Sequence, residues 1–200
     1  MVADGSRTLY AGAFGKRDGS EPDVRVDSLF NIASMTKAVT TVATLQLVEQ
    51  GKVDLSEPVA RLLPRLANLD VLDGFDATGK TLASACGDPD FYWPIPRALL
   101  RLMGGQMFRY APAKPGPLMF EPGTRWQYGQ GVDWAGRLVE AISGVTLKNY
   151  FQQKILRPLG MEDTSYILPE SKFDRLVSSY HRGPNGDLQQ NERKLPGRPW

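Results

Sequence analysis

The sequence predicts an α+β chain, in which helices with an apolar face alternate with short extended segments. Apolar residues recur at helical spacing over residues 34–50, 132–143 and 146–157. Segments bounded by Gly and Pro, such as residues 7–19 and 178–190, instead indicate strands and a hairpin. With 200 residues, 42% of them hydrophobic, the chain can bury a sizeable core, as one domain or as one domain with an added lobe.

The N-terminal elements are predicted from turn residues and apolar spacing. Residues 7–19 combine aromatic and small residues between glycines, which predicts a strand with a turn at each end. Residues 23–33 continue in extended form up to Ser34. The helix over 34–50 ends at Gly51, because glycine accepts the left-handed conformation that closes many helices.

The next part of the chain contains one predicted helix and a long irregular region. Ser56 is the expected N-cap of a helix over 57–66, with Pro58 in its first turn. Residues 78–123 are dense in Gly and Pro and show no sustained period. We expect loops there, with one short helix over 97–103.

Regular structure is predicted again in the C-terminal part. We expect a turn at residues 121–124 and an extended piece at 126–128. Two amphipathic helices follow, over 132–143 and 146–157. A short helix over 169–176 and a hairpin over 178–190 complete this part. Gly144 closes the first of these helices. The hairpin turns at Pro184, Asn185 and Gly186.

Composition excludes several classes of function. Lys and Arg number 24 and Asp and Glu 22, so the net charge is only +2, and nucleic acid is not an expected partner. A single cysteine, Cys86, excludes an internal disulfide, and with a single histidine, His181, we expect no metal and no other cofactor. We expect no signal peptide, because the first ten residues contain Asp4 and no apolar segment. Residues 28–48 form a run long enough to span a membrane, but they include too many polar side chains to do so. We therefore expect a soluble, cytoplasmic protein.

One lysine stands out in this apolar run. Lys37 is the only charged residue from Ser28 to Val48, and it follows Ser34 by three positions. Residues at this spacing share one face of a helix. Ser34 lies at the helix start, where free N–H groups can stabilise an oxyanion. A lysine removed from water can act as a base toward a serine, or keep its charge and favour ionisation of a neighbour.

A structural explanation of the same pattern is also open. Ser-x-x-Lys occurs often by chance, and Ser34 could simply cap the helix while Lys37 extends to solvent. Two observations disfavour a chance occurrence. The chain contains no second Ser-x-x-Lys, and Lys37 is the only charged residue from Ser28 to Val48.

Longer motifs carry a resemblance to a known family. LFNIASMTKAVTTVATLQLVEQGKVDL resembles the active-site helix of the serine β-lactamase and penicillin-binding-protein superfamily, most closely family VIII carboxylesterases and class C β-lactamases. MFEPGTRWQYGQGVDWAGRLVEAISG is similar to the second family motif, in which a tyrosine follows a Pro-Gly turn, and YFQQKILRPLGMEDTSY resembles the stretch after it. The resemblance covers residues 12–18, 29–63 and 120–168.

The resemblance implies a fold and a set of site residues. The fold is β-lactamase/transpeptidase-like, an antiparallel sheet flanked by helices with a helical lobe beside it. Ser34 is the implied nucleophile, and Lys37 and Tyr128 form the base system, since a phenolate favoured by a nearby ammonium can accept the serine proton. Which of the two is the formal base stays open. Gln130 occupies a substrate-binding position, and Asp133 matches an acidic residue of the esterase branch that also suits a helix start.

The chain departs from the family pattern at several points. It lacks a Leu-Leu-x-His-Thr-Ser-Gly-like segment, and its end, KLPGRPW, does not match the Lys-Thr-Gly, His-x-Gly or Trp-x-Gly motif of the family. We therefore expect an incomplete sheet and a truncated chain, with residues 81–117 aberrant. The expected division is residues 1–60 for the α/β part with the active-site helix, 61–165 for the lobe with the tyrosine motif, and 166–200 for the return to the sheet.

The predicted function is a serine hydrolase that cleaves small esters or amides, a carboxylesterase or β-lactamase-like enzyme, through an acyl-enzyme on Ser34. The alternative is an inactive fragment, or a non-catalytic member that binds acyl or peptidoglycan-like ligands. A Ser-His-Asp hydrolase using His181 is disfavoured, because no Gly-x-Ser-x-Gly elbow is present. The expected partner is a small ester or β-lactam, and an exposed sheet edge could also promote self-association.

Overall fold

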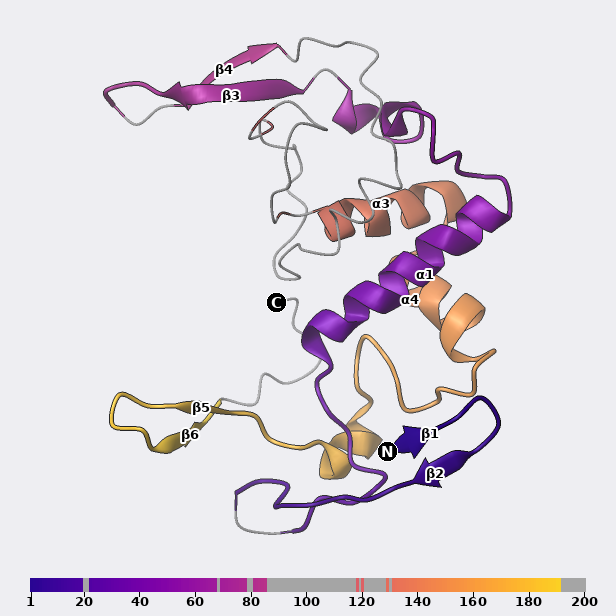
Figure 1. Cartoon of the computed structure of the whole chain (residues 1–200), viewed down its shortest axis with the longest axis vertical. Coiled ribbons are helices and arrows are strands. Elements are labelled where there is room, and N and C mark those ends of the chain that lie inside the picture. The colour runs from indigo at the N-terminus through magenta and orange to yellow at the C-terminus, as the bar shows by residue number, and fades with distance from the viewer. Residues whose placement is uncertain are drawn as a thin grey trace. The chain divides into compact units, whose positions relative to one another are not determined.

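The computed structural model describes residues 1–19, 22–67, 69–78, 81–85, 118, 120, 129 and 131–191 (Figure 1). The chain forms two compact units, one of residues 33–162 and one that combines residues 1–32 with residues 163–200. Helices and small antiparallel sheets occur together, which confirms the predicted α+β class. In the part of the chain described, no helix is both long and apolar enough for a membrane span.

Helix α1 (Thr36–Glu49) is the central element of the first unit and follows a 3-10 turn, η1 (Ala33–Met35). Its buried face carries residues at helical spacing: Lys37, Thr40, Ala43, Thr44 and Leu47. The hydroxyls of Thr40 and Thr44 donate to the carbonyls of Thr36 and Thr40, so these threonines are buried with their hydroxyls bonded. The helix ends as predicted, with Gly51 at a φ of +68°.

Helices α3 (Gly131–Ser143) and α4 (Leu147–Phe151) pack against α1, and α4 continues into a π-helical turn, η4 (Gln152–Leu156). Both predicted helices are confirmed. Together with α1 they bury one apolar core, made of Ala43, Leu47, Val53, Leu138, Val139, Tyr150, Phe151, Ile155 and Leu156. This packing anchors α1 through Ala43 and Leu47.

The helix predicted over 57–66 is wrong. Two short 3-10 turns, η2 (Val59–Arg61) and η3 (Pro64–Leu66), replace it. Ser56 is not an N-cap, because its N–H and its hydroxyl both donate to Asp54 Oδ1 in a local turn. Pro64 has no N–H and disfavours helical backbone in the residue before it, so a continuous α-helix cannot pass through this position.

A hairpin that was not predicted extends into the region 78–123, where we expected loops and one short helix. Strands β3 (Asp70–Phe75) and β4 (Thr81–Ala85) pair antiparallel, with a register shift between Leu72 and Gly74. The shift interrupts the alternation by which strands are identified in a sequence. The predicted helix over 97–103 and the pieces at 121–124 and 126–128 lie outside the described residues, as does most of 81–117.

The second unit is built from short strands and one 3-10 helix. Strand β1 (Val2–Ala3) pairs with β2 (Thr8–Tyr10), so the strand predicted over 7–19 is much shorter than expected. The short helix predicted over 169–176 is present as η5 (Glu170–Arg175). The hairpin is also confirmed: β5 (Tyr180–Arg182) pairs with β6 (Leu188–Gln190) across a turn that contains Gly186.

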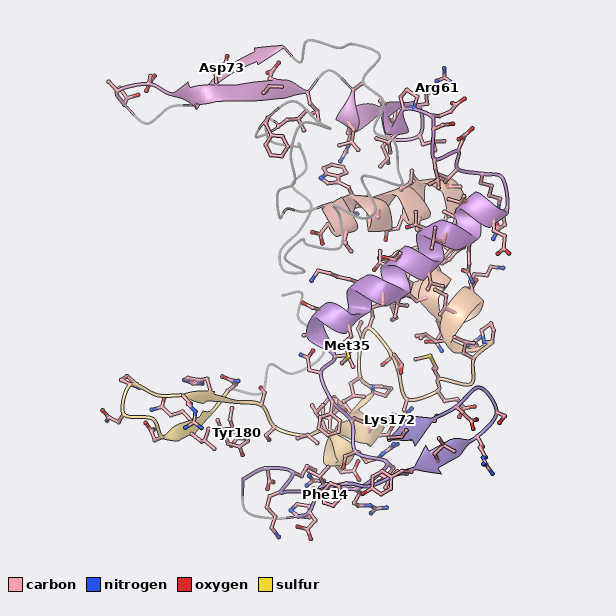
Figure 2. The ribbon with its side chains drawn as sticks, in the orientation of Figure 1. Phe14, Met35, Arg61, Asp73, Lys172 and Tyr180 are labelled. Carbon is pink, nitrogen blue, oxygen red and sulfur yellow. The ribbon has the colours of Figure 1, made fainter. Side chains whose placement is uncertain are left out.

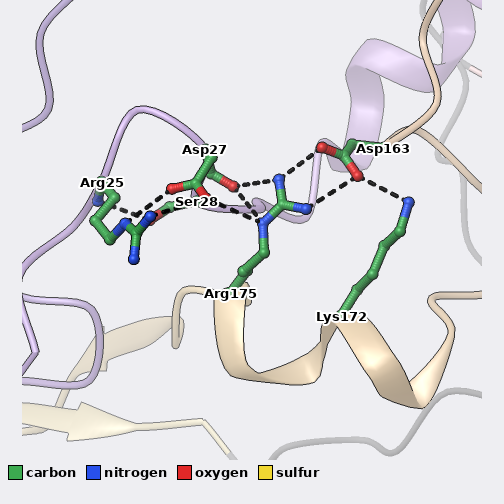
Figure 3. Close-up of polar contacts among 6 residues, drawn as sticks. All are labelled: Arg25, Asp27, Ser28, Asp163, Lys172 and Arg175. Atoms are coloured by element: carbon green, nitrogen blue, oxygen red, sulfur yellow. Dashed lines mark hydrogen bonds and ion pairs between the residues drawn. The ribbon is translucent and has the colours of Figure 1, made fainter.

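A cluster of charged side chains ties the two chain segments of this unit together (Figure 3). Arg175 Nη2 donates to Asp163 Oδ2 at 2.6 Å, and its Nε donates to the Asp27 carbonyl at 2.8 Å. Lys172 Nζ lies 2.8 Å from Asp163 Oδ1. The hydrogen bonds from Arg175 and then Lys172 lower the pKa of Asp163 to about 2. Next to the cluster, Leu29 N–H donates to the Arg175 carbonyl at 2.8 Å.

We predict that Leu47→Ala lowers the free energy of unfolding by about 2–5 kcal/mol, because Leu47 is fully buried in the core and the substitution leaves a cavity. Urea denaturation followed by circular dichroism measures this change. Leu45→Ala is the matched control on the same helix, because Leu45 is 45% exposed, and it should cost less than about 0.5 kcal/mol. Equal losses in both variants would contradict this assignment of the core.

The Asp163 cluster predicts a pH dependence of stability. Because the folded pKa lies below the ordinary value of 3.8, ionised Asp163 stabilises the fold above that value, and this stabilisation is lost as the pH falls toward about 2. Asp163→Asn should remove this part of the acid-induced loss, as measured by denaturation at a series of pH values. Asp187→Asn, an exposed carboxylate in the β5–β6 turn, should keep the wild-type pH dependence. A wild-type profile in Asp163→Asn would contradict the prediction.

Candidate active site

Ser34 and Lys37 meet at the N-terminal end of α1, as their spacing predicts. Lys37 Nζ lies 2.9 Å from Ser34 Oγ, within hydrogen-bonding distance. Lys37 is only 8% exposed, whereas Ser34 is exposed to solvent in the η1 turn. A buried nitrogen thus contacts an accessible hydroxyl, which is the arrangement that a serine nucleophile requires.

The backbone in front of Ser34 helps to place it. Ala33 adopts a φ of +41°, in the left-handed region that non-glycine residues rarely occupy. This conformation turns the extended chain sharply into the η1 turn, so that Ser34 precedes α1 by two positions. Met35, 64% exposed, marks this end of the helix in Figure 2.

The structure contradicts the explanation in which Ser34 only caps the helix and Lys37 only extends into solvent. The N-cap of α1 is Met35, and no side chain makes a capping hydrogen bond there. Ser34 therefore does not cap the helix. Lys37 does not extend into solvent either, because it is buried and its Nζ points at Ser34 Oγ.

The contact allows two arrangements of protons. An ammonium on Lys37 can donate to Ser34 Oγ and stabilise the alkoxide that forms when the serine proton leaves. A neutral amine can instead accept the serine proton directly. Both arrangements raise the nucleophilicity of Ser34.

Asp133 is a charged neighbour of this pair. From the sequence it matches an acidic residue of the esterase branch and also suits a helix start. It lies half-buried in the first turn of α3. Burial raises the pKa of the Asp133 carboxyl, while a hydrogen bond from its own backbone N–H and the charges of Lys37 and Arg137 lower it in part. Its proximity to Lys37 depends on how α1 packs against α3, which no local sequence pattern reveals.

Two predicted site residues, Tyr128 and Gln130, lie outside the described residues. In the sequence they immediately precede α3, whose first turn carries Asp133. Their roles stay predictions. Within the described ranges, no group of three or more His, Cys, Asp or Glu side chains is arranged to hold a metal ion.

Comparison with known proteins finds consistent relatives. A family model described as Beta-lactamase matches residues 1–198. ML-236A carboxylate methylbutanoyltransferase from Penicillium citrinum is 33% identical over 92% of this chain and 50% of its own length. Lovastatin esterase from Penicillium rubens is 34% identical over 88% of this chain and 47% of its own.

Solved structures agree with these matches. The unliganded simvastatin synthase LovD from Aspergillus terreus superposes with a TM-score of 0.74 at 30% identity, over 90% of this chain and 51% of that protein. The chain therefore spans about half the length of the relatives that it matches.

We predict that Lys37→Met slows the release of p-nitrophenol from an activated phenyl ester by about 10²-fold or more, because Ser34 loses its polar partner. Single-turnover spectrophotometry measures the rate. Lys52→Met is the control, since Lys52 is an exposed lysine just past the end of α1. A rate within about twofold of wild type in Lys37→Met, with circular dichroism showing a folded chain, would contradict a role of Lys37 in activating Ser34.

Proposed function

We propose that Ser34 is an acyl-accepting nucleophile in an enzyme that acts on small carboxylic esters. The premise is that the chain belongs to the Beta-lactamase family. The observation that carries the proposal is the 2.9 Å contact between Lys37 Nζ and Ser34 Oγ, with the lysine buried and the serine exposed. Family membership and the structural neighbours confirm the predicted resemblance and the β-lactamase/transpeptidase-like fold.

The proposed reaction has two half-reactions. Ser34 Oγ attacks the ester carbonyl carbon while the base system, Lys37 with Tyr128, accepts the hydroxyl proton. The tetrahedral intermediate collapses, the C–O bond to the leaving alcohol breaks, and that alcohol takes up the proton. Water or a second alcohol then attacks the acyl-serine and releases an acid or a new ester. The Ser34 N–H is the proposed oxyanion donor, and Gln130 is proposed to contact substrate.

The relatives favour ester chemistry over β-lactam hydrolysis. Those compared above are, by name, a methylbutanoyltransferase, an esterase and a synthase. The first two names describe the transfer or the release of an acyl group. The acyl-enzyme scheme accounts for both, because they differ only in whether an alcohol or water attacks the acyl-serine. We therefore propose that acyl transfer to an alcohol competes with hydrolysis in the second half-reaction.

The proposal predicts a covalent acyl-enzyme. Incubation with p-nitrophenyl butanoate, followed by an acid quench and intact-mass measurement, should show one butanoyl group per chain, because acylation of Ser34 precedes release of the acid. Ser34→Ala should show none, and Tyr128→Phe should acylate at least about tenfold more slowly. Added alcohol should divert part of the acyl group from butanoic acid to the ester.

Two outcomes would contradict the proposal. One is p-nitrophenol release from Ser34→Ala at the wild-type rate. The other is reversible ester binding without a covalent adduct, which is the behaviour expected of the non-catalytic alternative. Rapid turnover of a chromogenic cephalosporin, with no turnover of the ester, would instead favour β-lactamase chemistry.

A further inference from the structure

Asp133 and Lys37 lie on two helices that pack against each other, α3 and α1. Gly136 of α3 faces Thr40 of α1, since a Cβ atom at Gly136 would lie in ordinary van der Waals contact, 3.9 Å from Thr40 Cγ2. Asp133 precedes Gly136 by three residues, and Lys37 precedes Thr40 by three, so each charged residue is one turn from this contact on its own helix.

Gly136 also faces the first residue of α4, Leu147. A Cβ atom at Gly136 would also approach Leu147 Cδ2 to 2.8 Å, so only glycine fits here without displacing that side chain. Val132, Ala135, Leu138 and Val139 of α3 are buried around it. Asp133 is therefore carried by a well-packed helix and not by a mobile loop.

The charge of Lys37 acts on Asp133, which lies on the helix that packs against α1. Lys37 and Arg137 are the cations whose charges act on Asp133, and Arg137 is itself paired with Glu140 at 3.1 Å. From the other elements that pack on α1, Lys148 of α4 is exposed, and Lys154 of η4 meets α1 at Gln46, far along the helix. A buried ammonium requires such compensation, because desolvation of an unpaired charge is costly.

Within the described part of the chain, Lys37 Nζ contacts Ser34 Oγ and forms no direct ion pair with Asp133. The carboxylate thus acts through a short stretch of low-dielectric interior and leaves the serine contact intact. If Asp133 bonded Lys37 directly, it would compete with Ser34 for the same nitrogen.

We propose that Asp133 is a positioning residue for the reaction proposed above, whose carboxylate keeps Lys37 as an ammonium directed at Ser34 Oγ. This inference rests on the proposed function and selects between the two proton arrangements. Lys37 then donates to Ser34 Oγ and stabilises the alkoxide, and the serine proton passes to a group other than Lys37. A carboxylate that only stabilises the start of α3 would have no such effect.

The closing experiment measures the coupling of the two charges directly. The chain is labelled with ¹³C at aspartate side-chain carboxyls, and the Asp133 signal is assigned by its loss in Asp133→Asn. Lys37→Met should raise the Asp133 titration midpoint, because the carboxylate loses a compensating cation. Lys37→Arg should keep most of the wild-type value, and Lys52→Met, the distant lysine control, should leave it unchanged.

An unchanged Asp133 midpoint in Lys37→Met would overturn the proposal, and so would equal midpoints in Lys37→Met and Lys37→Arg. If Lys37→Met does not fold, Lys37→Gln repeats the comparison with a polar neutral side chain. In the acylation assay, Asp133→Asn should slow the reaction about tenfold and Asp133→Glu should recover much of the rate, whereas Glu140→Gln should match wild type.

The two proposals fail in different ways. The titration requires no turnover, so a midpoint that responds to Lys37 in a chain that forms no acyl-enzyme supports the charge coupling while the proposed function fails. If Ser34 forms an acyl-enzyme but the Asp133 titration midpoint is the same in wild type and Lys37→Met, the proposed role of Asp133 is wrong and the proposed function is still supported.

Discussion

The burial of one lysine is the constraint on which the site depends. Lys37 is 8% exposed within a helix face that otherwise carries threonine, alanine and leucine, and its nitrogen lies 2.9 Å from Ser34 Oγ. Such a charge is tolerated only with polar partners of fixed geometry. The packing of α1 with α3 and α4 holds the helix that carries Lys37, so the same helix contributes to the core and to the candidate site.

Small residues allow the helices to come close enough for this arrangement. Gly136 gives α3 room beside Thr40 and Leu147, and the threonine hydroxyls on α1 bond to carbonyls within their own helix. The buried face of α1 can therefore be polar at one end and apolar at the other. Leu47 anchors the apolar end in the core, and Lys37 occupies the end near Ser34.

Features set by local rules could be predicted from the sequence, and features set by contacts between distant segments could not. The Ser34–Lys37 contact and the helix stop at Gly51 follow from helical spacing and glycine conformation. The hairpin formed by β3 and β4 was missed because pairing of the main chain, with a register shift, leaves little pattern in one strand alone. Asp133 was undervalued because its partner lies on another helix. Tyr128 and Gln130 came from resemblance to a family and lie outside the described residues.

The most direct test of this account is the reactivity of Ser34 itself. Treatment with a fluorophosphonate probe, followed by intact-mass measurement and peptide mapping, reports whether one serine is activated over all the others. The account predicts a single adduct on the peptide that contains Ser34 and no adduct in Ser34→Ala. An adduct on another serine, or no adduct on the folded wild-type chain, would contradict the claim that the Lys37 contact makes Ser34 a nucleophile.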